Sequence, residues 1–560
     1  MIAPHPSALS DRYDLCVIGS GPAGMIAAIE FARNNPSRHV LLTEFGGHKE
    51  AARNSLDDSI HNLNPANHHD PYECTNKGLG GSSITWGGRC VMYDEVDFIE
   101  RPVVRDHCTW DTALFEEVCR YREDSAAYFE CGTGPFRTTD MPHLREHRIA
   151  DGFREGDVLD SVVERWSMPT RFGSRYRREI ENTPNLTLGL NLEARDIHSD
   201  AHGRVTSIEF RHAPSGTTVP VRAASFVIAA GTQETTRILL RNTRIFDTIG
   251  GPPAALGRYY QGHVSGKIAS VRFSGVPRAT DHGFHRDPDG SYFRRRFQLR
   301  TEALCRENLL NTAIWLDNPL YHEPAHRNGA MSLMYLAMVT PVLGKRLAPP
   351  AIANSVTKGR VHRVPAHILN VIRDIPSSIV IPATTFFWRY CLKRKLPGIF
   401  LHNPQNRYAL HFHAEQLPDP DNRMRLADDG ETLEIHYRLT DGDVQSVIRV
   451  HEILDAWLRE CGCGELEYWF PENQRADAIR RMSRDGIHQS GTTRIAASPE
   501  SGVVDRNLRV WGTENLHVCS SSVFPTSSQA NPTFFLGMFA IRLARHLASS
   551  PQEPAVPGAP

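Results

Sequence analysis

A glycine-rich turn near the N-terminus constrains the fold of this chain more than any other feature. Residues 13–18 (YDLCVI) form a short apolar run rich in β-formers, 19–24 read GSGPAG, and 25–35 have a helical pattern. A second apolar run, 40–43, ends at Glu44. Strand, glycine turn, helix, strand and acid at this spacing predict a dinucleotide-binding βαβ unit.

Each residue type in this unit has a physical reason. Gly19 permits the tight turn, Gly21 lets the backbone approach a pyrophosphate, and Gly24 lets the helix pack closely on the strand. The helix N-terminus presents free N–H groups to the phosphates. Glu44 is placed to accept hydrogen bonds from a ribose. The unit by itself fits FAD and NAD equally.

A second glycine-rich run, KGLGGSSITWGG at 77–88, cannot form a regular helix or an interior strand. Its backbone N–H groups are free to converge on an anion or to lie against a planar ring, and Ser82 and Ser83 add hydroxyl donors. A surface loop is the alternative. Because the run follows a dinucleotide unit, we favour a loop that cradles the cofactor.

Composition excludes several classes of protein. The net charge of -1 gives no electrostatic case for nucleic acid, and 40% hydrophobic with 23% charged residues is ordinary for a globular chain. Eleven cysteines without a CxxC motif favour reduced thiols. Because the first residues also lack an export signal, we expect a cytoplasmic protein.

Two apolar runs, 331–343 and 377–388, are interrupted by proline or polar residues and fall short of the roughly 20 residues that span a bilayer. We therefore expect no transmembrane segment. The second run precedes a basic cluster that ends at Lys395, so the 377–395 segment could touch a membrane. A buried helix with a basic end is the favoured interpretation.

A polar loop at 45–75 carries His61, His68 and His69. A metal site is conceivable, but the histidines have no fixed ligand spacing and no cysteine partner nearby. We favour a solvated loop and expect no metal.

The middle of the chain changes pattern three times. Residues 111–165 predict helices, and 186–237 predict strands that lead into a helix near Gly231. Further strands are expected at 292–300, 407–416, 424–426 and 432–439. In 407–416, His411, His413 and Glu415 alternate with other residues and so share one face. That face borders either a substrate cavity or solvent, and the pattern leaves both open.

Five segments together resemble one enzyme family, the GMC (glucose-methanol-choline) oxidoreductases. They cover roughly half of the chain, and the C-terminal block, HQSGTTR followed by GVVDRNLRVWGTENLHVCSSSVFPTSSQANPTFF, is the most specific. The resembling segments are 78–88, 94–110, 229–240, 415–426 and 488–535. Departures from the family pattern are Ile495 in place of methionine, Ser520 where aspartate or glycine is common, and Phe534 and Phe535 in place of smaller residues.

The resemblance implies an α/β fold in which a Rossmann-like FAD-binding domain is interleaved with an antiparallel-sheet substrate domain. The FAD-binding domain would comprise 10–265, with a helical insertion at about 111–165, and 481–549. The substrate domain would comprise 266–480, and 550–560 would be a disordered tail. The residues that the motifs place at the cofactor are Gly19, Gly21, Pro22, Ala23, Gly24, Glu44, Gly80, Gly81, Ser82, Ser83, Thr85, Trp86, Ala230, Ser520, Ser522, Pro532 and Thr533.

The resemblance also implies the chemistry. His488 would be the base that takes the proton of a substrate hydroxyl, and Asn531 would hold the same oxygen. The Trp86-type loop resembles the sugar-oxidising pyranose oxidase branch, so we expect a sugar or polyol, with His411, His413 and Glu415 as substrate contacts. Some relatives attach flavin covalently through a histidine in this loop. Thr85 occupies the matching position, so we expect FAD to be bound non-covalently.

Two alternatives stay open on the sequence. One is oxidation of a sterol or another apolar alcohol, for which Phe534 and Phe535 would suit an apolar cavity. The other is a non-redox lyase or decarboxylase of the same family. The electron acceptor, whether oxygen, a quinone or a protein, is not indicated by any residue.

Overall fold

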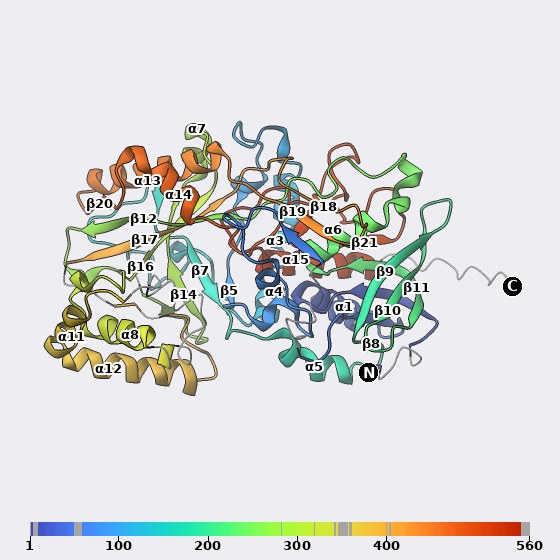
Figure 1. The fold of residues 1–560 in the computed structure, drawn as a ribbon, viewed down its shortest axis with the longest axis horizontal. Coiled ribbons are helices and arrows are strands. Elements are labelled where there is room, and N and C mark those ends of the chain that lie inside the picture. The colour runs from blue at the N-terminus through green and yellow to red at the C-terminus, as the bar shows by residue number, and fades with distance from the viewer. Residues whose placement is uncertain are drawn as a thin grey trace.

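The N-terminal glycine turn follows a strand of a mixed sheet on one side of the molecule (Figure 1). The computed structural model describes residues 2–3, 9–49, 59–281, 283–318, 320–340, 343–344, 357, 361–398, 400–401 and 405–549. The strand order is β1-β8-β3-β2-β11-β10-β9, with β21 paired to β11. The strands are β1 (Ile2–Ala3), β2 (Arg12–Ile18), β3 (Val40–Thr43), β8 (Leu186–Gly189), β9 (Leu192–Ser199), β10 (Val205–His212), β11 (Thr218–Ile228) and β21 (Leu516–Val518).

The predicted βαβ unit is confirmed as β2, α1 (Pro22–Asn34) and β3, with β3 parallel to β2. Every residue of β3 is buried, as expected for a parallel strand covered on both faces. The C-terminal helix α15 (Pro532–Ser549) packs against α1, so the two ends of the chain share one hydrophobic core (Figure 1).

A second sheet occupies the other side of the molecule (Figure 1). Its order is β20-β12-β17-β16-β15-β6, and its pairs are antiparallel, as expected for the substrate side. The helices α13 (Asp441–Glu460) and α14 (Glu472–Met482) pack on it through a separate core. The strands are β6 (Val158–Leu159), β12 (His263–Phe273), β15 (Phe297–Leu299), β16 (Thr312–Asp317), β17 (Arg407–Glu415) and β20 (Gly464–Tyr468).

The remaining elements are helices and the strands of two smaller sheets, one of four strands and one of three. The helices are α2 (Pro71–Cys74), α3 (Thr112–Cys119), α4 (Arg122–Phe129), α5 (Phe172–Asn182), α6 (Gly231–Arg241), α7 (Thr301–Glu307), α8 (Gly329–Val339), α11 (Val364–Arg373) and α12 (Ile375–Phe386). The strands are β4 (Ile60–Asn62), β5 (Arg89–Cys90), β7 (Val163–Trp166), β13 (His285–Arg286), β14 (Tyr292–Arg295), β18 (Arg423–Leu426) and β19 (Leu433–His436).

Two sequence predictions about elements are wrong in part. The α-helices expected over 111–165 end at Phe129, and β6 and β7 follow them. The expected strand 292–300 divides into β14 and β15, which join different sheets. Because β6 pairs with β15, the chain reaches the second sheet long before residue 265. The domain boundaries remain a proposal, and the expected disordered tail lies outside the described residues.

The histidine-bearing loop is solvated only in part, because His61 is exposed but His68 and His69 contact other parts of the chain. His68 is buried, and its Nε2 lies 2.6 Å from the Tyr260 hydroxyl. His69 Nδ1 lies 2.6 Å from Asp485, which precedes the candidate base by three residues. These contacts tie the loop to the site because each buried polar group needs a partner.

The apolar 377–388 segment was expected to be a buried helix, and the structure corrects this. Ile379 and Val380 in α12 are 64% and 57% exposed, and Phe387 just beyond it is 53% exposed. Periodicity shows that a helix has an apolar face but not which way that face points. Among the described residues, no helix has both the length and the apolar character needed to cross a membrane.

Candidate active site

The turn between β2 and α1 has the geometry that its three glycines predict. Gly19 has φ 103°, a conformation that side chains disfavour. A Cβ on Gly24 would lie 1.9 Å from the Gly19 carbonyl oxygen, so only glycine lets the helix approach. A Cβ on Gly21 would meet nothing within 4 Å. Gly21 therefore leaves the front of the helix N-terminus open to a ligand.

Glu44 follows β3 and lies at the edge of this opening. Its carboxylate accepts hydrogen bonds from the Ser20 hydroxyl at 2.6 Å, the Ser20 N–H at 3.1 Å and the Gly46 N–H at 3.0 Å. Burial raises the pKa of Glu44, and these hydrogen bonds oppose the rise. The acceptor is therefore fixed in place beside the glycine turn.

The second glycine run folds back onto the first. The Gly80 N–H donates to the Ser20 carbonyl at 3.2 Å, and a Cβ on Gly81 would approach the Gly21 Cα to 2.9 Å. Gly80 and Gly81 have φ 105° and 51°. The Trp86 indole donates to the Thr170 carbonyl at 2.9 Å, which fixes the end of the loop. The two glycine loops thus face each other across one opening.

A single cavity runs along both loops to the C-terminal block. The predicted residues that line it are Gly19, Gly21, Pro22, Ala23, Glu44, Gly81, Ser82, Ser83, Trp86, Ala230, His488, Ser520, Pro532 and Thr533. Four predicted cofactor residues do not line the cavity: Gly24, Gly80, Thr85 and Ser522. Gly24 and Gly80 shape the backbone, and Thr85 donates to the Asn76 side chain at 2.7 Å.

His488 lines this cavity and contacts Asn531, which lies outside the lining and 43 residues away in the sequence. His488 Nε2 and Asn531 Nδ2 are 2.7 Å apart. The preceding residue, Ile487, has φ 62°, an outlier for a β-branched side chain. Strain of this kind is concentrated at functional sites.

Neighbouring contacts hold both residues in place. The Gln489 carbonyl accepts hydrogen bonds from Thr232 at 2.8 Å and Ser521 at 2.7 Å, which anchors the chain beside His488. The Gln529 side chain accepts from Arg296 at 2.6 Å and donates to Asp94 at 2.8 Å, which anchors the segment before Asn531.

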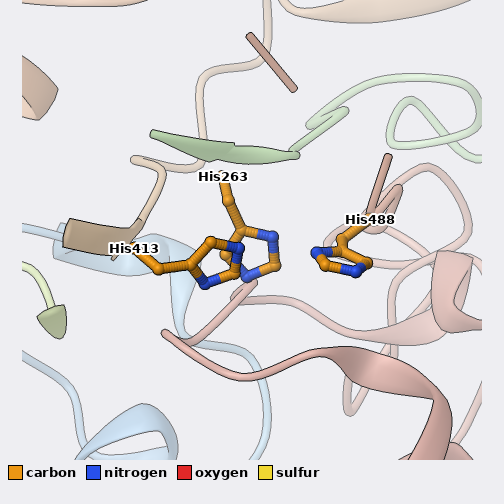
Figure 2. A group of neighbouring side chains, drawn as sticks. All are labelled: His263, His413 and His488. Atoms are coloured by element: carbon orange, nitrogen blue, oxygen red, sulfur yellow. The ribbon is translucent and has the colours of Figure 1, made fainter. Parts of the chain in front are cut away.

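His263 and His413 bring two more imidazoles to His488 (Figure 2). The rings of His263 and His413 stack with centroids 4.1 Å apart, and each meets His488 edge-on at 5.1 Å and 5.5 Å. Antiparallel pairing of β12 with β17 produces the stack. His413 Nδ1 donates to the Gln529 carbonyl at 2.8 Å, which leaves its Nε2 as an acceptor.

Burial lowers the pKa of all three imidazoles well below the usual 6.5, and neighbouring imidazoles or the Arg89 guanidinium lower it further. The cluster is therefore neutral at pH 7. Three ring nitrogens lie within 4.8 Å of one another, which is a possible metal constellation. However, lone pairs lie in the ring plane, so those of two stacked rings run side by side and converge poorly on one ion.

Comparisons with known proteins agree with this site. The chain is 21% identical to paromamine 6'-oxidase of Streptomyces fradiae, with 96% of this chain and 91% of that protein covered. It is 20% identical to 6'''-hydroxyparomomycin C oxidase of Streptomyces lividus, with 97% and 93% covered. Residues 418–540, which include both His488 and Asn531, match a family model described as GMC oxidoreductase. The C-terminal part of the chain therefore matches the GMC oxidoreductases.

Solved structures support the fold. A formate oxidase of Aspergillus oryzae, studied for modification of its FAD, superposes with a TM-score of 0.52 at 14% identity, covering 96% of this chain and 99% of that one. The chain therefore has the α/β architecture that the sequence predicted.

GMC oxidoreductases bind flavin, and the residues of the cavity fit such a group. One end offers the open glycine turn and helix N-terminus for phosphates. At the other end, three buried polar atoms have no partner among the described residues: His488 Nδ1, Asn531 Oδ1 and Gln489 Nε2. Unpaired buried polar atoms mark a place where a ligand is expected.

Two of the three expected substrate contacts do not reach this end of the cavity. Glu415 is fully buried, and Arg101 donates to both of its oxygens at 2.8 Å and 3.0 Å, so we reassign it from substrate binding to structural stabilisation of the sheet. His411 stacks on Trp315 and lies 3.0 Å from the Ser265 hydroxyl. Only His413 comes beside His488.

The sequence reasoning missed His263 and Arg89. His263 lies 150 residues from His413, and no motif surrounds it. Arg89 directly follows the second glycine loop and lies with its guanidinium 4.1 Å from the Trp315 ring centroid. The sequence could have indicated Arg89 only through its position directly after that loop.

Proposed function

We propose that the protein oxidises a CH–OH group of a sugar or sugar-like polyol to a carbonyl, with non-covalently bound FAD. When bound, FAD supplies the acceptor, at N5, for the hydride that leaves the substrate carbon. The protein then has two tasks: to take the hydroxyl proton and to hold the substrate oxygen. The contact between His488 and Asn531 at the end of the cavity carries this proposal.

Both tasks can be performed on one oxygen. Because His488 Nε2 and Asn531 Nδ2 are 2.7 Å apart, a single hydroxyl oxygen can lie within hydrogen-bond reach of both. Neutral His488 accepts the proton at Nε2. In the free site, an N–H of Asn531 donates to His488 Nε2. The substrate hydroxyl replaces that N–H at Nε2, and Asn531 then donates to the substrate oxygen and stabilises its developing negative charge.

The electrostatics of the cluster favour His488 as a base. Since burial lowers its pKa well below 6.5, His488 is neutral and able to accept a proton throughout the neutral range. His263 and His413 are neutral for the same reason, so they do not compete as cations. They instead offer polar edges to a substrate that carries several hydroxyl groups.

The substrate class is supported by the relatives and by these side chains. Two relatives over nearly the full chain are described as oxidases of paromamine and of 6'''-hydroxyparomomycin C. A polyol has hydroxyls to pair with the polar atoms beside His488, such as the buried His263 Nε2, which has no partner among the described residues. An apolar alcohol would leave such a buried polar atom unsatisfied at a cost of about 1–3 kcal/mol.

The test is flavin reduction in anaerobic stopped flow with the purified holoenzyme. His488→Ala should keep flavin and lose about 10²–10⁴ in the rate of reduction, and Asn531→Ala should lose less because it accepts no proton. His436→Ala, in β19 and outside the lining of the cavity, is the control and should reduce at the parent rate. A His488→Ala enzyme that keeps flavin and the parent rate would remove His488 from the mechanism.

Two further readouts belong to the same experiment. In the parent enzyme, the rate should stay level as pH falls through 6.5 and drop only well below it, since protonation of His488 removes the base. Sugars, glycosides, amino sugars and cyclitols should bleach the flavin. Rapid bleaching by sterols or fatty alcohols alone would contradict the substrate class, and flavin binding without bleaching by any alcohol would favour a non-redox reaction.

A further inference from the structure

We propose that an apolar face on α11, α12 and the residues beside them docks on an anionic lipid bilayer. We call it the α11–α12 face, and its side chains are Val361, Ile368, Leu369, Ile372, Ile375, Ile379, Val380, Phe386, Phe387 and Trp388. The inference concerns the surface of the protein and does not depend on the proposed reaction.

The face concentrates exposed apolar side chains in one short stretch. Among the described residues, fifteen large hydrophobic side chains are exposed, and ten of them lie between Val361 and Trp388. Their exposure ranges from 37% at Trp388 to 68% at Val361. Single exposed hydrophobics are ordinary, but a contiguous patch marks an interaction site.

The spacing places these side chains on one side of each helix. Four residues separate Ile375 from Ile379 in α12, and Phe387, just beyond this helix, follows eight residues later. In α11, four residues separate Ile368 from Ile372. Residues four apart lie on one face of a helix. Both helices therefore present an apolar stripe to the outside.

Three polar side chains of the same helices point inward, whereas Arg373 and Thr384 are exposed. His367 is fully buried with Nδ1 3.1 Å from the Ser332 hydroxyl of α8, and Asn370 donates to the Pro324 carbonyl at 2.8 Å. Ser378 is buried and donates to the Asp374 carbonyl. A helix on a water-facing surface has the reverse arrangement. These hydrogen bonds on the inner side fix how α11 and α12 are rotated. The outward position of the apolar face is therefore the orientation that the inner contacts stabilise.

The charge of this segment favours an anionic lipid surface over a second copy of the chain as the partner of the α11–α12 face. The sequence from 361 to 395 has six lysine or arginine residues and one acidic residue, Asp374, in a chain whose net charge is -1. Asp374 accepts a hydrogen bond from the Gly329 N–H at 3.0 Å and is turned toward α8. A second copy of the face would bring like charges together, whereas an anionic lipid surface attracts them.

The dimensions fit a helix pair that lies on the membrane rather than crosses it. α11 has 10 residues and α12 has 12, which is about 15–18 Å of helix against a hydrocarbon core of about 30 Å. Trp388 stands at the end of the apolar face beside the basic residues, as is typical of an interfacial anchor. In Figure 1, α8, α11 and α12 lie together at the edge of the molecule farthest from α1 and the N-terminal sheet.

The test is flotation of the holoprotein with vesicles of phosphatidylcholine alone or with 30% phosphatidylglycerol. We expect flotation with the anionic vesicles, weakened by salt. The double variant Ile379→Ser/Phe387→Ser should lose at least about tenfold in partitioning, because two large apolar side chains no longer insert. Lys393→Glu/Lys395→Glu should lose at least about tenfold on anionic vesicles, since each basic residue near the surface contributes about fivefold.

Val276→Ser is the matched control, because Val276 is 63% exposed but lies off the face. It should float like the parent, and flavin absorbance with circular dichroism should show that every variant is folded. Failure to float with either vesicle, or flotation that the face variants leave unchanged, would overturn the proposal. A lipid-free dimer that these variants dissociate would assign the face to a second copy instead. Flavin reduction, measured separately, is not a readout here.

Discussion

Replacing Gly24 by alanine should destabilise the fold, whereas replacing Gly21, three residues earlier, should weaken flavin binding. A Cβ at position 24 would lie 1.9 Å from the Gly19 carbonyl oxygen, whereas ordinary van der Waals contact begins near 3.4 Å. The helix must therefore move by more than 1 Å against the strand. A Cβ at position 21 meets nothing within 4 Å, and φ there is −66°, which alanine adopts freely.

The magnitudes follow from this geometry. Gly24→Ala should lower the unfolding free energy of the apoprotein by about 3 kcal/mol or more, at the upper end of the cost of overpacking. Gly21→Ala should leave that stability unchanged or raise it by about 0.4–1 kcal/mol, because the unfolded chain loses freedom. Its methyl group projects into the opening instead, so flavin affinity should fall at least about tenfold, which is 1.4 kcal/mol.

The assay is urea unfolding of each apoprotein together with titration by FAD, followed by fluorescence. Gly283→Ala is the control, because a Cβ there would meet nothing within 4 Å, its φ is not positive and it does not line the cavity. Parent-like flavin affinity in Gly21→Ala, or a parent-like urea midpoint in Gly24→Ala, would refute the assignment of the turn.

Two further predictions test single side chains. Acid precipitation should leave the yellow colour in the supernatant, because Thr85 stands where a covalent histidine link would form; colour in the pellet would contradict non-covalent binding. Arg101→Leu should lower the unfolding free energy by about 3–5 kcal/mol, because the Glu415 carboxylate would stay buried without its cation. The double variant Arg101→Leu/Glu415→Leu should recover most of this loss in urea unfolding, and an equal loss in both would rule out an uncompensated charge as the cause.

Local sequence determined the parts of the structure whose physics is local. The glycine turn, α1 and Glu44 follow within about thirty residues, so backbone freedom, helix periodicity and strand composition suffice to predict them. The alternation along β17 likewise predicted that His411, His413 and Glu415 share a face. The C-terminal motif indicated both His488 and Asn531 by resemblance.

Tertiary structure decided what those residues face. Strand pairing brings His263 beside His413, and Arg101 binds Glu415, which lies 314 residues away in the sequence. Local periodicity predicts neither contact. The orientation of α11 and α12 is the clearest case. Their apolar periodicity is the same whether the stripe packs on a core or faces outward, because a period identifies a face but not its partner. Only the buried hydrogen bonds of His367 and Asn370 with neighbouring segments turn the polar side inward and leave the apolar side exposed.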